Sequence, residues 1–151
     1  MTETSGPILL WLSSRYENLE LAQAVLSHLC RQAGVGEETE HWIGVALREA
    51  VANAIKHGNH QDPGKRVYLS FRLEGDDLMI VVGDEGEGFE PGDVPDPLAP
   101  ENQLKTSGRG IFYMKTFMDD VSFSRGELGG TILAMRKSLR PVEGGKGVET
   151  R

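Results

Sequence analysis

Residues 49–58 read EAVANAIKHG, a stretch that sets a carboxylate, Glu49, four residues before a carboxamide, Asn53. Residues 38–57 around it predict a helix, because apolar side chains recur at helical spacing. The apolar stripe of this helix is Ile43, Leu47, Ala50 and Ala54. Positions i and i+4 share a helix face, so Glu49 and Asn53 are expected side by side, about a quarter-turn from the stripe.

This pair can do chemistry. An amide oxygen is a hard ligand suited to Mg²⁺, which takes few protein ligands besides phosphates and water. A carboxylate can accept a proton from a hydroxyl group. The alternative for Glu49 and Asn53 is a solvated helix face with a routine i,i+4 contact.

Upstream of this helix, the sequence predicts one strand and one further helix. Residues 8–12 are a short apolar run, which favours a strand. Ser14 and Glu17 have the spacing of a capping box, in which both side chains bond free amides at a helix start. Gly34 ends the helix that follows. Its apolar positions are Leu19, Ala22, Leu26, Leu29 and Ala33.

Downstream, the pattern changes to strands. Residues 67–73 alternate apolar and polar side chains, residues 74–77 are typical of a hairpin turn, and residues 78–82 predict a buried strand. Residues 83–107 hold four prolines and show neither the helical nor the strand periodicity of apolar residues. After Gly108 we expect a short helix, and then strands at 121–125 and 132–135 joined by a turn at 126–130. Segregated helices and strands indicate an α+β two-layer domain.

Composition limits the possible functions. The chain has 151 residues, enough for one domain, and a formal net charge of −7, which does not favour direct nucleic-acid binding. Its single cysteine, Cys30, falls in an apolar helical pattern and is expected to be a buried thiol. No apolar run approaches the ~20 residues of a membrane span. We therefore expect a cytoplasmic protein without membrane contact. We also expect residues 138–151 to be a disordered tail.

Three further segments carry weaker signals. Residues 84–89, DEGEGF, follow a buried strand, so that Asp84 could accept a hydrogen bond from an exocyclic amine. Residues 107–111, SGRGI, could expose amides to a phosphate at a helix start. Residues 129–131, GGT, precede the last strand. Taken singly, these are also typical of an acidic turn, a hinge and a hairpin turn.

Together, the four segments resemble the nucleotide-binding boxes of the gyrase/chaperone/histidine-kinase/mismatch-repair ATPase superfamily. In this resemblance residues 49–58 are the N box, 84–89 the G1 box, 108–110 the G2 box and 129–131 the G3 element. The resemblance spans nearly all of residues 8–137. It implies a histidine-kinase-like ATPase fold, with helices on one face of a mixed, mainly antiparallel sheet. It also implies ATP under a lid formed by about residues 90–107.

The resemblance assigns roles residue by residue. Asn53 would bind Mg²⁺, Asp84 would read the adenine amine, and Glu49 would be the general base. The other residues expected around ATP are Lys56, His57, Gly86, Gly88, Phe89, Lys105, Thr106, Ser107, Gly108, Arg109, Gly110, Ile111 and Thr131.

Within the superfamily, the chain resembles the stand-alone serine kinases of bacterial partner switching, which are anti-sigma factors. About seven residues precede the first predicted strand and fourteen follow Lys137, so we expect none of the extra domains of other family members. The resemblance implies a sigma factor and an anti-anti-sigma substrate as partners, and a homodimer formed through the sheet edge or first strand. The alternatives are a stress-signalling switch kinase without a sigma partner and a non-catalytic ATP-binding module.

Overall fold

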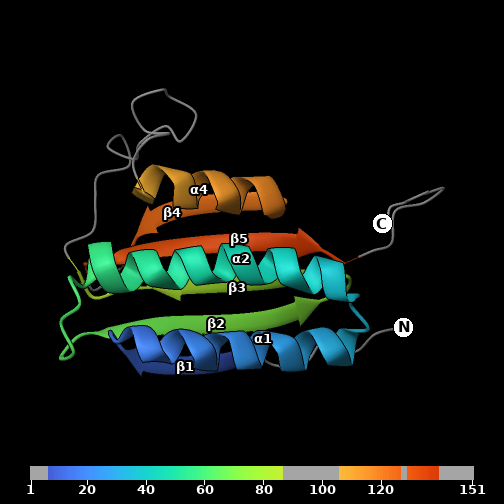
Figure 1. The fold of residues 1–151 in the computed structure, drawn as a ribbon, viewed down its shortest axis with the longest axis horizontal. Coiled ribbons are helices and arrows are strands. Elements are labelled where there is room, and N and C mark those ends of the chain that lie inside the picture. Colours follow the sequence, from blue (N-terminus) through green and yellow to red (C-terminus); the bar gives the residue numbers. More distant parts are fainter. Residues whose placement is uncertain (1–6, 87–105, 127–128, 140–151) are drawn as a thin grey trace.

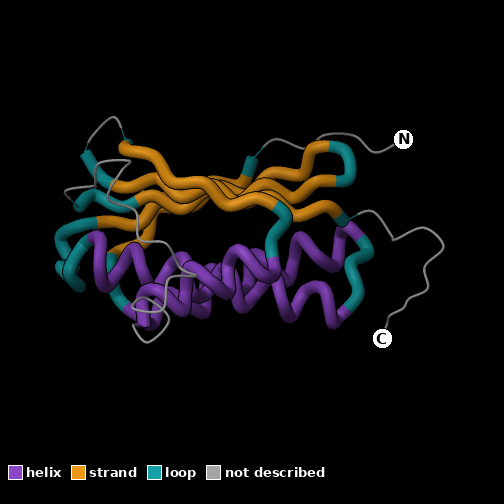
Figure 2. Tube along the Cα trace, turned by 90° about the horizontal axis from the view of Figure 1, so that it is seen from above, coloured by secondary structure: helices purple, strands orange, loops and turns teal. Residues whose placement is uncertain are grey.

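The computed structural model describes residues 7–86, 106–126 and 129–139, which form two layers. One layer is a five-stranded sheet, and the helices cover one of its faces (Figures 1 and 2). The strands are β1 (Ile8–Ser13), β2 (Arg66–Glu74), β3 (Asp77–Gly83), β4 (Asp120–Arg125) and β5 (Thr131–Ser138). The α-helices are α1 (Leu19–Ala33), α2 (Glu37–Asn53) and α4 (Thr106–Phe117). A 3-10 turn η1 (Tyr16–Asn18) precedes α1, and a π-helical turn η2 (Ala54–Gly58) follows α2. The predicted α+β two-layer class is confirmed.

The strand order is β1-β2-β3-β5-β4, and every pair among the described strands is antiparallel. The register pairs Leu69 with Val82 and Val82 with Leu133. Short turns explain the antiparallel direction of two of these pairs, β2–β3 and β4–β5, since strands joined by a short hairpin connection must run antiparallel. The resemblance implied a mixed sheet, and no parallel pair occurs in the described part.

The core lies between the sheet and the helices. Alternate side chains of the strands point into it, such as Val67, Leu69 and Phe71, which are fully or almost fully buried. The helices contribute a matching apolar face: Leu26, Ile43, Leu47, Ala50, Ile55 and Met114. Cys30 is buried and free, as expected, and burial raises the pKa of its thiol to about 11, so the unreactive thiol form is favoured.

Two predicted boundaries differ from the structure. Ser14 does not cap a helix, because its hydroxyl is buried and donates to the Lys65 carbonyl (2.9 Å). The capping-box prediction with Glu17 is therefore wrong, and η1 begins without a side-chain cap. At the other end of the fold, β5 extends through Ser138, and the Leu139 N–H donates to the Asp76 carbonyl (2.6 Å). The rest of the predicted tail lies outside the described residues.

Helix α2 also ends earlier than the predicted His57. The regular helix stops at Asn53, and the chain continues through the wider turn η2. Just beyond it, His60 and Gln61 adopt positive φ (53° and 57°). Such π-helical turns occur often at functional sites. In the described ranges, none of the helices combines the length and apolar character needed to cross a membrane.

Candidate functional site

Glu49 and Asn53 do lie on one face of α2, and that face is covered by α4. A Cβ atom added to Gly110 would lie 2.8 Å from Glu49 Oε1 and 3.4 Å from Asn53 Nδ2. Glycine at position 110 is therefore what lets α4 approach the carboxylate and carboxamide so closely. Both side chains are partly exposed, so a ligand or solvent can reach them.

Asp84 follows the last residue of β3 and is held by the start of β5. Its N–H donates to the Thr131 carbonyl (3.1 Å), and the Thr131 N–H donates back to Asp84 Oδ1 (3.2 Å). Oδ1 also accepts from the Gly86 N–H (2.9 Å). Burial raises the pKa of the Asp84 carboxyl, while these backbone hydrogen bonds and nearby positive charge oppose the rise. The result is a desolvated carboxylate in a fixed orientation at the end of the sheet.

Three glycines from three segments crowd this carboxylate. A Cβ on Gly58, at the end of η2, would overlap the Asp84 carboxylate itself. A Cβ on Gly130 would overlap the Asp84 backbone carbonyl, and one on Gly86 would overlap the Gly58 carbonyl. The glycines are thus required by close backbone approach and not only by turn geometry. The structure therefore brings Gly58, Asp84, Gly86 and Gly130 together, although they come from three separate segments of the chain.

Asn59 also belongs to this site, although its local sequence is typical of a turn. Its side chain is fully buried, with 0% exposed. Its Nδ2 donates to Ser14 Oγ (2.7 Å) and to the Arg66 carbonyl (2.9 Å), and its Oδ1 accepts from the Glu85 N–H (2.8 Å). One amide side chain therefore fixes the backbone immediately after Asp84. The local sequence gives no sign of this, because the partners are distant in the chain.

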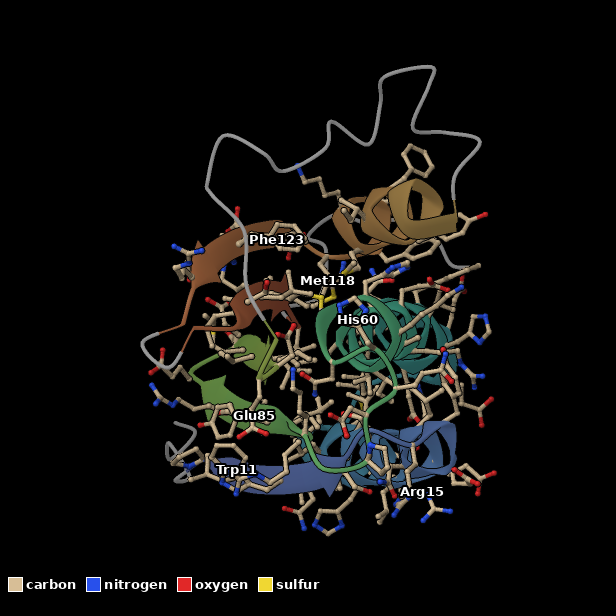
Figure 3. All side chains as sticks on the ribbon, turned by 90° about the vertical axis from the view of Figure 1, so that its left-hand side faces the viewer. Trp11, Arg15, His60, Glu85, Met118 and Phe123 are labelled. Atoms are coloured by element: carbon tan, nitrogen blue, oxygen red, sulfur yellow. The ribbon has the colours of Figure 1, made fainter. Side chains whose placement is uncertain are left out.

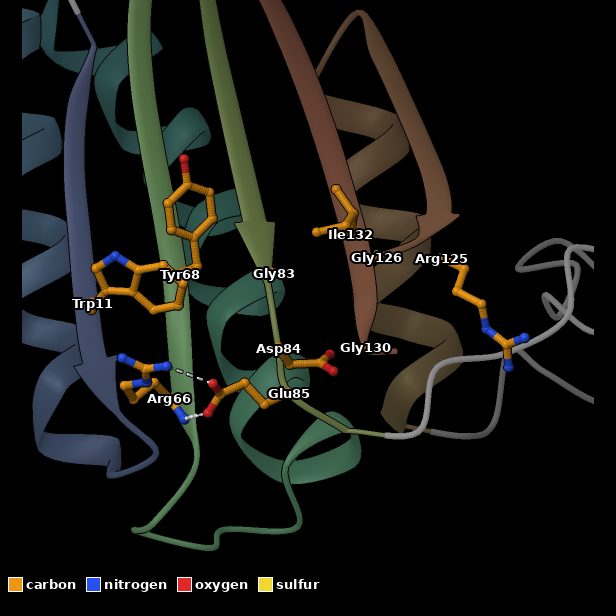
Figure 4. A pocket seen from close by; sticks show the side chains of 10 residues that line it. All are labelled: Trp11, Arg66, Tyr68, Gly83, Asp84, Glu85, Arg125, Gly126, Gly130 and Ile132. Carbon is orange, nitrogen blue, oxygen red and sulfur yellow. Dashed lines mark hydrogen bonds and ion pairs between the residues drawn. The ribbon is translucent and has the colours of Figure 1, made fainter. Parts of the chain in front are cut away.

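Glu85 faces the other way, toward the sheet face that the helices leave open (Figure 3). Its carboxylate accepts from the Arg66 N–H (2.6 Å) and from Arg66 Nη2 (2.9 Å), and these hydrogen bonds lower the pKa of Glu85 (Figure 4). The Arg66 guanidinium lies over the Trp11 ring, 4.5 Å from its centroid. Beside them, Trp11, Tyr68 and Ile132 line a pocket of about 350 Å³ (Figure 4).

The remaining predicted residues divide into four groups. Lys56 and His57 are exposed on η2, and partial burial lowers the pKa of His57. Ile111 is buried in the core. Residues 106–110 form the first turn of α4, so Gly108 and Gly110 lie inside the helix and do not precede it as the sequence predicts. Gly88, Phe89, Lys105 and the lid up to residue 105 lie outside the described residues, as do the side chains at 106–109.

A metal would find few protein ligands here. Within residues 7–86, 106–126 and 129–139, no group of three or more His, Cys, Asp or Glu side chains could hold a metal ion. Mg²⁺ bound to phosphates needs only one or two protein oxygens. The Asn53 amide oxygen, next to Glu49, fits that kind of site.

The chain is similar to known proteins over most of its length. A family model described as the histidine kinase-like ATPase domain matches residues 12–137. An anti-sigma F factor of Oceanobacillus iheyensis is 31% identical over 125 residues, which are 82% of this chain and 86% of that protein. The serine-protein kinase RsbW of the same organism is 26% identical, over 84% of this chain and 83% of that protein.

Solved structures show the same fold. The crystal structure of the RsbU and RsbW domains of Rv1364c from Mycobacterium tuberculosis superposes with a TM-score of 0.65 at 20% identity. The match covers 91% of this chain but only 34% of that one. The catalytic domain of the histidine kinase ThkA superposes with a TM-score of 0.56 at 10% identity, covering 89% of this chain and 99% of that one.

Proposed function

The chain belongs to the histidine kinase-like ATPase domain family, and from that premise we propose that it is a serine protein kinase and anti-sigma factor. In this proposal it binds a sigma factor and transfers the γ-phosphoryl group of ATP to a serine of a small anti-anti-sigma protein. The relatives named anti-sigma F factor and serine-protein kinase RsbW support it. ATP and sigma factors are both cytoplasmic, so the cytoplasm is the proposed location.

The observation that carries the proposal is the pairing of Glu49 with Asn53 against Gly110. In the proposed reaction, the serine Oγ attacks the γ-phosphorus, its proton passes to the Glu49 carboxylate, and the bond from the γ-phosphorus to the bridging oxygen breaks to release ADP. Glu49 can take that proton only if it is ionised and within hydrogen-bond reach of the serine. Positioning and electrostatics supply most of the remaining catalysis.

The other residues would bind and orient ATP. Asp84 would accept a hydrogen bond from the adenine amine, and the fixed carboxylate described above is suited to that task. The first amides of α4, at Thr106 to Arg109, lack partners within the helix and would bind phosphate oxygens. Lys56, His57 and Lys105 would add positive charge or polar contacts near the phosphates.

Asn53 would hold Mg²⁺ through its amide oxygen. When bound, the ion neutralises charge on the phosphates during transfer. The packing of Gly110 against Asn53 would keep the amide oriented, since a larger residue there would crowd it.

We also propose that the protein forms a homodimer through β1. This strand is at one edge of the sheet and exposes Leu9 (53%) and Trp11 (52%) on its outward face. Edge strands with apolar side chains readily pair with another chain. Sedimentation of the full chain should show a dimer, and Leu9→Lys with Trp11→Lys should convert it to a monomer. A monomeric parent protein would remove this part of the proposal.

The kinase reaction is tested with purified protein, Mg·ATP and a panel of anti-anti-sigma proteins, with phosphoserine as the readout. Glu49→Gln should lower the transfer rate by about 100- to 10,000-fold and leave ATP binding intact. Glu37→Gln, an exposed acid at the start of the same helix, is the matched control and should change nothing. Equal rates for both variants would rule out Glu49 as the base.

Sigma binding needs a separate assay. The protein should retain purified sigma factors on a column when Mg·ATP is present, and the anti-anti-sigma protein should release them. Phosphorylation without retention of any sigma factor would instead identify a switch kinase that lacks a sigma partner. ATP binding with neither activity would leave a non-catalytic module.

A further inference from the structure

Arg66 and Glu85 lie opposite each other just beyond the end of β3. The register pairs Tyr68 with Gly83, and continued by two residues it sets Arg66 against Glu85. The Glu85 carboxylate accepts from the Arg66 N–H (2.6 Å) and from Arg66 Nη2 (2.9 Å), as Figure 4 shows. The Asn59 carboxamide lies between their main chains, since it donates to the Arg66 carbonyl and accepts from the Glu85 N–H. These three residues form a closed ring of hydrogen bonds, which we call the Arg66 clamp.

The clamp holds the turn that orients the Asp84 carboxylate. Glu85 stands between Asp84 and Gly86, and the Gly86 N–H donates to Asp84 Oδ1 (2.9 Å). The Thr131 N–H donates to the same oxygen (3.2 Å). Within the described part of the chain, both hydrogen bonds of this carboxylate end on Oδ1, which leaves Oδ2 to accept from a ligand. A displacement of Glu85 would therefore change the direction in which Oδ2 points.

Stability alone does not explain the contacts of the Arg66 side chain. The Arg66 and Glu85 side chains are 54% and 28% exposed, and exposed ion pairs contribute little to folding. The Arg66 guanidinium also packs over the Trp11 ring at 4.5 Å, and Trp11 contacts the Tyr68 ring at 4.9 Å. Because a guanidinium is planar, a stacked ring and a hydrogen bond together fix its orientation, which a lysine ammonium would not provide. The arrangement is suited to orienting Glu85.

We propose that Arg66 is a positioning residue for adenine recognition, which acts through Glu85 on the Asp84 carboxylate. The inference rests on the proposed function, in which Asp84 accepts a hydrogen bond from the adenine amine. Arg66 itself would not touch the nucleotide, since its guanidinium lies over Trp11 on the sheet face that the helices leave open. Binding of the phosphates by α4 would not depend on it. Loss of Arg66 should therefore weaken recognition of adenine and not nucleotide binding in general.

The test compares Mg·ATP with Mg·ITP, the inosine nucleotide, whose base has a carbonyl where adenine has the amine. Calorimetry on the full chain measures both dissociation constants and requires no phosphoryl transfer. Arg66→Ala should weaken ATP binding by about ten-fold and leave ITP binding within about two-fold of the parent. Arg72→Ala is the matched control, because Arg72 forms an ion pair of the same 2.9 Å length with Glu74 at the other end of β2. It should change neither constant.

Hydrogen exchange without nucleotide tests the clamp directly. The Gly86 and Thr131 N–H groups should exchange about ten-fold faster in Arg66→Ala than in Arg72→Ala, because the carboxylate that they bond is no longer held. Glu85→Gln keeps the shape of the side chain and removes its charge. It should lower the preference for ATP over ITP in the same direction, and it carries the test if Arg66→Ala does not fold. The double variant should lose no more preference than Arg66→Ala alone, since both residues act on one carboxylate.

Three results would overturn the inference. If the parent prefers ATP and Arg66→Ala keeps that preference as Arg72→Ala does, the inference is wrong and the proposed function stands. Equal losses of ATP and ITP affinity in Arg66→Ala would show a general structural effect in place of adenine recognition. A parent with no preference for ATP over ITP would remove the adenine contact of Asp84 from the proposed function, and this inference with it.

Discussion

Replacing Asn59 with alanine should cost more stability than its place beside a surface turn suggests. The fully buried side chain makes three hydrogen bonds, to Ser14 Oγ, the Arg66 carbonyl and the Glu85 N–H. An orphaned buried polar group costs about 1–3 kcal/mol. The bond to Ser14 is wholly buried, whereas water can approach the other two, so we take about 2 kcal/mol for the first and about 1 for each of the others. The expected loss is roughly 4 kcal/mol.

Urea unfolding followed by circular dichroism measures this loss. With a slope of about 2 kcal/mol/M, the midpoint should fall by about 2 M and the slope should stay constant. Asn18→Ala is the matched control: Asn18 Nδ2 donates to the Ser13 carbonyl (2.9 Å) and Ser13 Oγ (3.1 Å), in a partly exposed local contact. The control should lose about 1 kcal/mol.

Equal losses for Asn59→Ala and Asn18→Ala would refute the reasoning, since they would mean that burial and long-range bonding at Asn59 add nothing. In the folded fraction, Asn59→Ala should also weaken Mg·ATP binding, because the Glu85 amide next to Asp84 is no longer held. Calorimetry at low temperature, where the variant stays folded, checks this second effect.

Three other substitutions separate stability from function. Gly110→Ala should keep or raise stability, since Ala is favoured over Gly in a helix by about 1 kcal/mol. It should nevertheless slow phosphoryl transfer, because the added methyl group displaces the Glu49 carboxylate. Thermal melting and kinase assays on one preparation check both effects. Gly58→Ala should lose nucleotide binding in calorimetry, because its Cβ overlaps the Asp84 carboxylate. Burial raises the pKa of Asp84, so its ionised form destabilises the fold as pH rises above about 3.9, the unfolded value. Asp84→Asn should therefore be more stable than the parent at pH 7 and equal to it near pH 3, while losing ATP binding; chemical unfolding across pH tests the sign.

Periodicity and turn residues were enough to predict the layers of the fold. The Glu49–Asn53 pair lies on one helix face as predicted, because i,i+4 geometry is local to α2. Asp84 follows β3 for the same kind of reason, since an apolar run that stops at Gly83 predicts where the strand ends.

Longer-range features could not be predicted in this way. Ser14 has the local spacing of a capping residue, but its hydroxyl bonds to Lys65, far along the chain. Asn59 is a residue type typical of turns, and it is buried because the chain at Ser14, after β1, and at Glu85 packs against it. The stacking of Trp42 on Phe117 depends on how α2 and α4 pack, which the spacing within either helix does not determine.

The hydrogen bonds of Asn59 also affect the stage of folding at which the protein can first bind nucleotide. Its partners are 45 and 26 residues away in the chain, and Asp84 needs Thr131, 47 residues further on. Contacts of such separation form late, because each requires a long loop to close first. In a chain emerging from the ribosome, the Asp84 carboxylate can be held in place only after Thr131 has been made. Nucleotide capture should therefore mark a fully synthesised and folded domain, and partial chains should not compete for ATP.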